Sequence, residues 1–109
     1  MSLVEKIFFN KQTDEKTIEK VIIDDQVHYL HLIFPKGEGL PIHQSNANMY
    51  MTVIRGVLSI GLNNQETQLY TIGTVLNIPC NTTMNVRNEN DAILELIIVK
   101  TPVHGKSCI

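Results

Sequence analysis

Few residues in this sequence carry groups that could do chemistry. The clearest candidate is His43, which lies in an alternating run of residues between Gly37 and Gly56. An imidazole can act as a general acid or base, and it can also anchor a ligand through a hydrogen bond. The sequence contains no nucleophile elbow and no phosphate-binding glycine loop. We therefore take His43 as the candidate acid or base.

The composition excludes several classes of function. The chain has 109 residues, enough for one domain; 43% of them are hydrophobic, and the formal net charge is −2. A protein that binds the phosphate backbone of nucleic acid usually has a basic cluster, which this sequence lacks. No apolar run approaches the ~20 residues of a membrane-spanning helix. We expect neither nucleic acid nor a membrane as a partner.

The N-terminus and the cysteines indicate the cellular location of the protein. Glu5 and Lys6 interrupt the apolar start of the chain, which argues against a secretory signal. Cys80 and Cys108 form no C-x-x-C motif and no framework typical of secreted proteins, so we predict two free thiols. The expected location is the cytoplasm.

Strands must position the candidate residues, because the sequence favours β-structure throughout. Short segments rich in β-branched and apolar residues recur about every ten residues, and turn-forming residues separate them. This pattern predicts an all-β sandwich or barrel. The expected strands are 17–23, 27–34, 40–45, 49–54, 57–62, 65–69, 75–78, 83–88 and 92–99.

The predicted strands divide the chain into three parts. We expect an N-terminal arm and linker over residues 1–16, a barrel over 17–101 and a C-terminal tail over 102–109. Within the arm, residues 4–9 are apolar and are a candidate strand. Strands 49–54 and 57–62 are expected to form a hairpin around Arg55-Gly56.

Two stretches of the sequence resemble the paired motifs of the cupin family of small antiparallel β-barrels. The Gly, His, His, Glu and Gly positions of the first cupin motif hold Gly37, His43, Ser45, Met49 and Gly56. The Gly, Pro, Gly, His and Asn positions of the second motif hold Gly73, Pro79, Asn81, Met84 and Asn88. The resemblance covers residues 17–101 and implies a jelly-roll-like double-stranded β-helix, the antiparallel β-barrel of the cupins.

The resemblance is strong at the turns and weak at the metal ligands. Cupins that bind metal use three histidines and one carboxylate, and the matching positions here are His43, Ser45, Met49 and Met84. A protonated hydroxyl and two uncharged thioethers are poor ligands for a hard or borderline dication. We therefore predict a degenerate metal site with no cofactor and no iron-dependent dioxygenase chemistry.

The matching positions imply a pocket inside the barrel. Met51 lies two residues after Met49 on one strand, so both should face inward together with Met84 and fill the emptied metal site. The predicted ligand pocket consists of His43, Ser45, Met49, Met51 and Met84.

Two metal sites remain as alternatives to a metal-free pocket. His43, Met49 and Met84 would suit Cu(I), with Cys80 as an additional ligand. A zinc site that combines His43 with His31 requires His31 to face the cavity. His31 and His28 are three residues apart on one strand, so no more than one of the two can face inward.

These observations lead to one favoured function and two alternatives. The favoured function is the binding of a small molecule in the barrel without metal-dependent catalysis, so we do not expect an enzyme. The alternatives are a small isomerase or lyase, with His43 as acid or base and Ser45 as hydrogen-bond donor, and a Cu(I)-binding protein. We also expect a homodimer, because Tyr50, Thr52 and Ile54 should face outward and the arm over 4–9 could cross to a partner.

Overall fold

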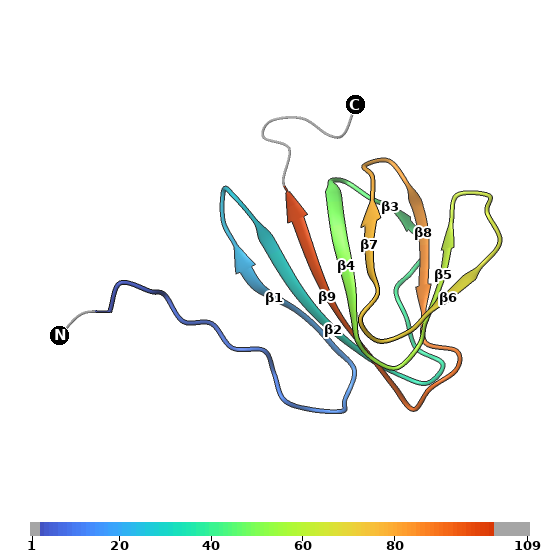
Figure 1. Ribbon diagram of the computed structural model, residues 1–109, viewed down its shortest axis with the longest axis horizontal. Helices are drawn as coiled ribbons and strands as arrows, with labels where there is room; N and C mark the ends of the chain where they lie inside the picture. Colours follow the sequence, from blue (N-terminus) through green and yellow to red (C-terminus); the bar gives the residue numbers. More distant parts are fainter. Residues whose placement is uncertain (1–2, 102–109) are drawn as a thin grey trace.

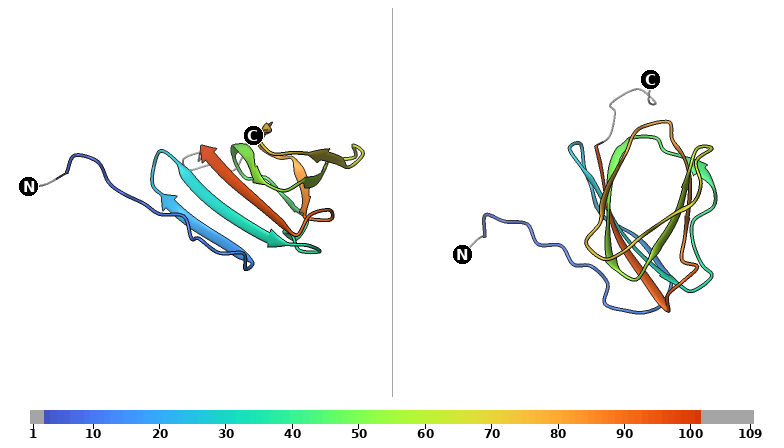
Figure 2. Two further views of the ribbon diagram at one scale, coloured as in Figure 1. Left: turned by 60° about the horizontal axis from the view of Figure 1, so that its bottom comes forward. Right: turned by 45° about the vertical axis from the view of Figure 1, so that its right-hand side comes forward.

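The computed structural model describes residues 3–101, which form nine β-strands and no helix. The strands are β1 (Thr17–Ile23), β2 (His28–Pro35), β3 (His43–Gln44), β4 (Asn48–Arg55), β5 (Leu58–Leu62), β6 (Gln68–Tyr70), β7 (Val75–Ile78), β8 (Thr83–Arg87) and β9 (Ile93–Thr101). One antiparallel sheet has the order β1-β2-β9-β4-β7, and a second has the order β3-β8-β5-β6. The two sheets face each other and enclose a barrel (Figure 1, Figure 2). The predicted all-β antiparallel barrel is confirmed.

Within residues 3–101 there is no helix with the length and apolar character needed to cross a membrane.

The core lies between the inner faces of the two sheets. Residues paired across antiparallel strands point to the same face, so the pairs Leu32–Leu96 and Val53–Leu96 place three side chains on the inside of the larger sheet. Phe34 and, from the smaller sheet, Leu58 pack with them, and all five are at most 1% exposed. These large side chains fill the barrel at the end where β2 finishes and β9 begins.

The turn between β4 and β5 carries the chain from one sheet to the other. β4 pairs with β7 and β9, whereas β5 pairs with β6 and β8, so the predicted hairpin around Arg55-Gly56 is wrong. Gly56 has a φ of +81°, and a Cβ at this position would lie 2.1 Å from the carbonyl oxygen of Ile93. The turn therefore packs against the start of β9, and this leads β5 away from β4.

The N-terminal segment leaves the barrel. Residues 4–9 form no strand within the described chain, and the segment extends away from both sheets (Figure 1, Figure 2). Its apolar side chains are exposed, from 50% at Phe8 and 83% at Phe9 to complete exposure at Val4. The predicted tail, 102–109, lies outside the described residues.

The prediction of a free thiol at Cys80 is wrong, because Cys80 is disulfide-bonded. The other cysteine of the sequence, Cys108, lies outside the described residues. Spacing along the chain does not reveal which segments of a β-barrel meet in space, so the disulfide could not be predicted from the sequence.

Three glycine-to-alanine variants separate backbone strain from close packing. Gly73 has a φ of +90° with open space around it, Gly39 has the carbonyl oxygen of Val86 at 2.3 Å from the added Cβ, and Gly56 combines both conditions. We expect Gly73→Ala to lower the free energy of unfolding by about 1–2 kcal/mol through the left-handed backbone and Gly39→Ala by about 1–3 kcal/mol through overpacking. Gly56→Ala should lower the free energy of unfolding by nearly the sum of these two losses. Urea unfolding of the three variants measures this, and equal losses at Gly56 and Gly73 would contradict the close contact with Ile93.

Candidate functional site

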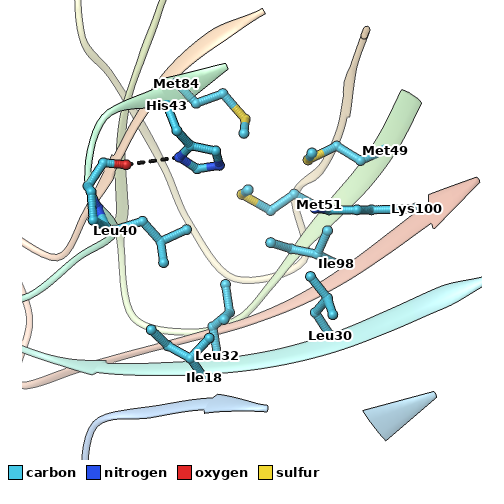
Figure 3. Close-up of a pocket in the computed structure, with 11 residues that line it drawn as sticks. Ile18, Leu30, Leu32, Leu40, His43, Met49, Met51, Met84, Ile98 and Lys100 are labelled. Atoms are coloured by element: carbon cyan, nitrogen blue, oxygen red, sulfur yellow. Dashed lines mark hydrogen bonds between the residues drawn. The ribbon is translucent and has the colours of Figure 1, made fainter. Parts of the chain in front are cut away.

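A cavity of about 250 Å³ lies inside the barrel, beside the filled end of the core. Figure 3 shows its lining side chains, which come from both sheets and from the segment before β3. The lining residues are Ile18, Leu30, Leu32, Leu40, Pro41, His43, Met49, Met51, Met84, Ile98 and Lys100.

The register of the larger sheet explains where the cavity lies. Leu30 pairs with Ile98, and Ile98 pairs with Met51, so these three line one wall side by side. They lie one inward-facing step beyond the closed layer that contains Leu32 and Leu96. The smaller sheet covers this part of the barrel less completely, since β3 spans just His43 and Gln44. The cavity therefore opens beside β3, where Pro41 and His43 are exposed.

His43 presents one nitrogen of its imidazole to the cavity. It pairs with Met84 across β3 and β8, and its Nδ1 donates a hydrogen bond of 2.9 Å to the carbonyl oxygen of Pro41. A carbonyl oxygen can only accept, so the proton of the neutral ring lies on Nδ1 and leaves Nε2 as an acceptor. Figure 3 shows the second ring nitrogen on the side that faces the methionine sulfurs.

The three methionines on the strands lie together in the lining. Met49, Met51 and Met84 are at most 2% exposed, and their thioethers turn toward one space in front of His43 (Figure 3). Unbranched thioether side chains adapt to irregular space, so this wall can change shape around a ligand.

Ser45 lies outside the cavity, contrary to the predicted pocket. Its side-chain hydroxyl donates to the carbonyl oxygen of Pro79 at 2.7 Å and accepts from the backbone N–H of Thr82 at 2.9 Å. Its backbone also bonds to Thr82 and Asn81. Ser45 therefore holds the turn between β7 and β8, which positions Met84 on β8.

Sequence reasoning missed Lys100, the second polar side chain of the lining. Lys100 is half-buried, and its Nζ lies 3.5 Å from Oδ1 of Asn46. Burial lowers the pKa of its amino group, and the positive charge of Lys20 lowers it further. The alternation of β9 contains the signal, because Lys100 lies two residues after Ile98 and therefore shares its inward face.

His31 faces away from the cavity, so the alternative zinc site with His43 is excluded. It lies on the outer face of the larger sheet, where it is fully buried. Its Nδ1 lies 2.7 Å from Oε1 of Glu19, and its Nε2 lies 2.5 Å from Oε2 of Glu95. His28, by the alternation of β2, points to the inner face.

A chain of charged groups surrounds His31. A hydrogen bond from the backbone N–H of Lys11 holds the pKa of Glu19 below its ordinary value; burial opposes this, and His31 adds to the lowering. Burial raises the pKa of Glu95, but His31 and Arg55 outweigh it and the net direction is downward. Both carboxylates are therefore ionised and can only accept, so His31 donates from both ring nitrogens and is a cation. The same Arg55 binds Asp14 at 3.0 Å, which ties the linker to the sheet.

The comparisons with known proteins identify the fold family. No family model matches the sequence. The chain is 33% identical over 101 residues to the uncharacterized protein MJ0764 of Methanocaldococcus jannaschii, covering 92% of this chain and 87% of that protein. The crystal structure of that protein, described as an RmlC-like cupin family protein with a double-stranded β-helix fold, matches with a TM-score of 0.88 over 93% of this chain and 94% of that chain.

The chain belongs to the RmlC-like cupin family. More distant cupins share the fold. A cupin superfamily protein from Desulfitobacterium hafniense matches at 12% identity with a TM-score of 0.73, over 87% of this chain and 84% of that chain. A cupin domain from Bordetella pertussis matches at 16% identity with a TM-score of 0.70, over 86% of this chain and all of that chain.

The residues of this cupin do not fit the family's usual metal. Within residues 3–101 no three His, Cys, Asp or Glu side chains come together as a metal site. At the motif positions the hydroxyl of Ser45 is engaged by the β7–β8 turn, and Met49 and Met84 supply uncharged thioethers. His43 alone offers a nitrogen ligand. This donor set does not suit a hard or borderline dication.

The charge network on the outer face makes the stability of this cupin pH-dependent. A carboxylate with a lowered pKa stabilises the fold above its unfolded value, near 4.5, and this contribution is lost as the pH falls through the folded value. We expect Glu95→Gln to lower the free energy of unfolding at pH 7 by about 2–4 kcal/mol, because it leaves the buried His31 cation with one carboxylate. The variant should also lose less stability than the wild type between pH 5 and pH 3, an interval set around the ordinary Glu value of 4.5.

Urea unfolding across this pH range measures both effects. The matched control is Glu89→Gln, which removes an exposed ion pair with Arg87 and should cost less than about 1 kcal/mol. An equal loss in the two variants would contradict the charged state assigned to His31.

Proposed function

We propose that this cupin binds a small organic molecule in its barrel and does so without metal-dependent catalysis. The observation that supports this proposal is the open cavity of about 250 Å³, in which nine of the eleven lining side chains are apolar. Ligand sites typically combine an apolar wall with a few polar groups that set orientation. His43 and Lys100 are those polar groups here, and a cytoplasmic location is part of the proposal.

Two other functions are each favoured by one observation. Nε2 of His43 faces the cavity, as an acid or base in a small isomerase or lyase would. The thioethers of Met49 and Met84 lie in the same lining as His43, as a Cu(I) site would require. Both are less well supported than binding. Catalysis lacks the predicted hydrogen-bond donor, because Ser45 lies outside the cavity. A Cu(I) site lacks an anionic ligand beside the thioethers among the described lining residues.

Methionine methyl resonances offer a direct test of binding in the barrel. The sequence has four methionines: Met49, Met51 and Met84 line the cavity, and Met1 lies outside the described residues. We expect 3-phenylpropan-1-ol, a neutral probe, to shift the 13C-methyl signals of Met49, Met51 and Met84 and to leave Met1 unchanged. The affinity should be in the range of a weak small ligand, with a dissociation constant of about 1 mM or lower.

Two variants of adjacent residues in β2 control this experiment. Leu30 lines the cavity and Tyr29 points to the opposite face of the sheet, so Leu30→Trp should block the shifts and Tyr29→Trp should preserve them. Shifts that persist in Leu30→Trp, or that spread to Met1, would contradict binding in the barrel.

We further propose that the protein is a homodimer in which the N-terminal arm of each chain covers an apolar surface of the partner. Phe9 in the arm is 83% exposed, and nothing in residues 3–101 covers it. The outward faces of β4 and β7 also expose large apolar side chains, at Tyr50, Ile54 and Val75. Large exposed apolar patches are typical of protein–protein interfaces, where a second surface removes them from water.

Light scattering coupled to gel filtration tests the arm. The wild type should have the mass of two chains, and removal of residues 1–9 should give the mass of one chain without a loss of β-sheet signal. The double substitution Lys11→Ala and Gln12→Ala, in the linker, serves as the control and should leave the dimer intact. A dimer that survives loss of the arm would contradict the proposed exchange.

A further inference from the structure

The polar groups of the cavity differ in what they can bind. His43 in its neutral form offers an acceptor at Nε2, because Nδ1 donates to Pro41. Lys100 offers donors and a positive charge. Figure 3 shows these two side chains on opposite sides of the space. Of residues 3–101, none that lines the cavity carries a carboxylate, so Lys100 is a cation with no acidic group beside it in this lining.

No carboxylate among residues 3–101 neutralises the charge of Lys100. None of the ion pairs formed within residues 3–101 includes Lys100. Its hydrogen-bond partner, Asn46, is a neutral amide. Burial without a counter-ion disfavours the charged amine, and this agrees with the lowered pKa of Lys100. A bound anion would supply the missing counter-ion.

Two further basic residues lie on the same face of the sheet. His28 pairs with Lys100 across β2 and β9, and antiparallel partners share a face. Lys20 pairs with Leu30, which lines the cavity, so Lys20 also lies on the inner face. This basic row, formed by Lys20, His28 and Lys100, favours the approach of an anion to the apolar cavity. Glu19 is next to Lys20 in the sequence but lies on the outer face, where it pairs with His31. Asp24 and Asp25 lie in the exposed turn after β1.

The volume limits the size of the ligand. An apolar cavity of about 150 Å³ can hold benzene, and pockets for drug-sized ligands begin near ~300 Å³. A cavity of about 250 Å³ therefore has room for one ring or a short aliphatic chain together with a small polar group.

From these observations we propose that the cavity selects small amphipathic carboxylates, with the apolar body against Met49, Met51 and Ile98 and the carboxylate at the amino group of Lys100. This inference rests on the proposed function, because it names the class of ligand for the same cavity. The carboxylate compensates the charge of Lys100, and the apolar walls recover the free energy of removing the ring or chain from water.

Three ligands of one shape test the inference. 3-Phenylpropionate, 3-phenylpropan-1-ol and 3-phenylpropan-1-amine differ in charge at one end, and each is titrated into the full-length protein with methionine methyl signals as the readout. We expect the carboxylate to bind at least tenfold more tightly than the alcohol and the amine to bind most weakly.

The variant Lys100→Met removes the charge and keeps an unbranched side chain. It should reduce the affinity for the carboxylate at least tenfold and leave the affinity for the alcohol within twofold of the wild type. Lys36→Met, an exposed lysine outside the lining, is the matched control and should change neither affinity.

The outcomes separate this inference from the proposed function. If the alcohol binds and the carboxylate has no advantage, or if Lys100→Met keeps that advantage, the selection for carboxylates is overturned while binding in the barrel stands. If none of the three ligands shifts Met49, Met51 or Met84, both proposals are overturned.

Discussion

The cavity depends on the strict alternation of side chains along β2, β9 and β4. Antiparallel pairing puts every second residue of these strands on the inside, and it aligns them in layers. The layer of Leu32, Leu96 and Val53 is closed by packing against the smaller sheet. The next layer contains Leu30, Ile98 and Met51, and here the smaller sheet contributes little beyond the short strand β3. A protein interior is normally filled to the density of an organic crystal, so an open layer next to a closed one marks a place where a second molecule can pack.

The metal-binding positions of the cupin family have taken other roles in this chain. Ser45 uses its hydroxyl to hold the turn between β7 and β8, and Met49 and Met84 form an apolar wall. His43 keeps one nitrogen toward the cavity while Pro41 fixes its tautomer. The charged groups nearby lie elsewhere: Lys100 is on the inner face of the larger sheet, and the ion pairs of His31 are on its outer face. This arrangement supports the proposal that the barrel binds an organic ligand and not a metal ion.

The sequence was sufficient to predict the fold, because turn residues and strand periodicity are local properties. Asn81 stands where the family usually has glycine, and its φ of +65° shows that it supplies the same left-handed turn. The inward direction of Met49 was implied by its match to a cupin motif position, and spacing on one strand placed Met51 on the same face. The position of Ser45, the pairing of His31 with two carboxylates and the disulfide of Cys80 did not follow, since each depends on segments that are distant in the chain. Lys100 could have been found from the alternation of β9, because a basic residue on the inward face of a strand indicates a polar group in the lining of the barrel.

We propose that this barrel retains a cavity but lacks the ligands with which cupins usually hold a metal ion. The most direct test is a crystal structure of the protein purified without chelator, with anomalous diffraction recorded at the absorption edges of iron, nickel, copper and zinc. We expect no anomalous peak beside His43, and density in the cavity that belongs to an organic molecule or to water. An anomalous peak about 2 Å from Nε2 of His43, at the distance of a metal–imidazole bond, would contradict it.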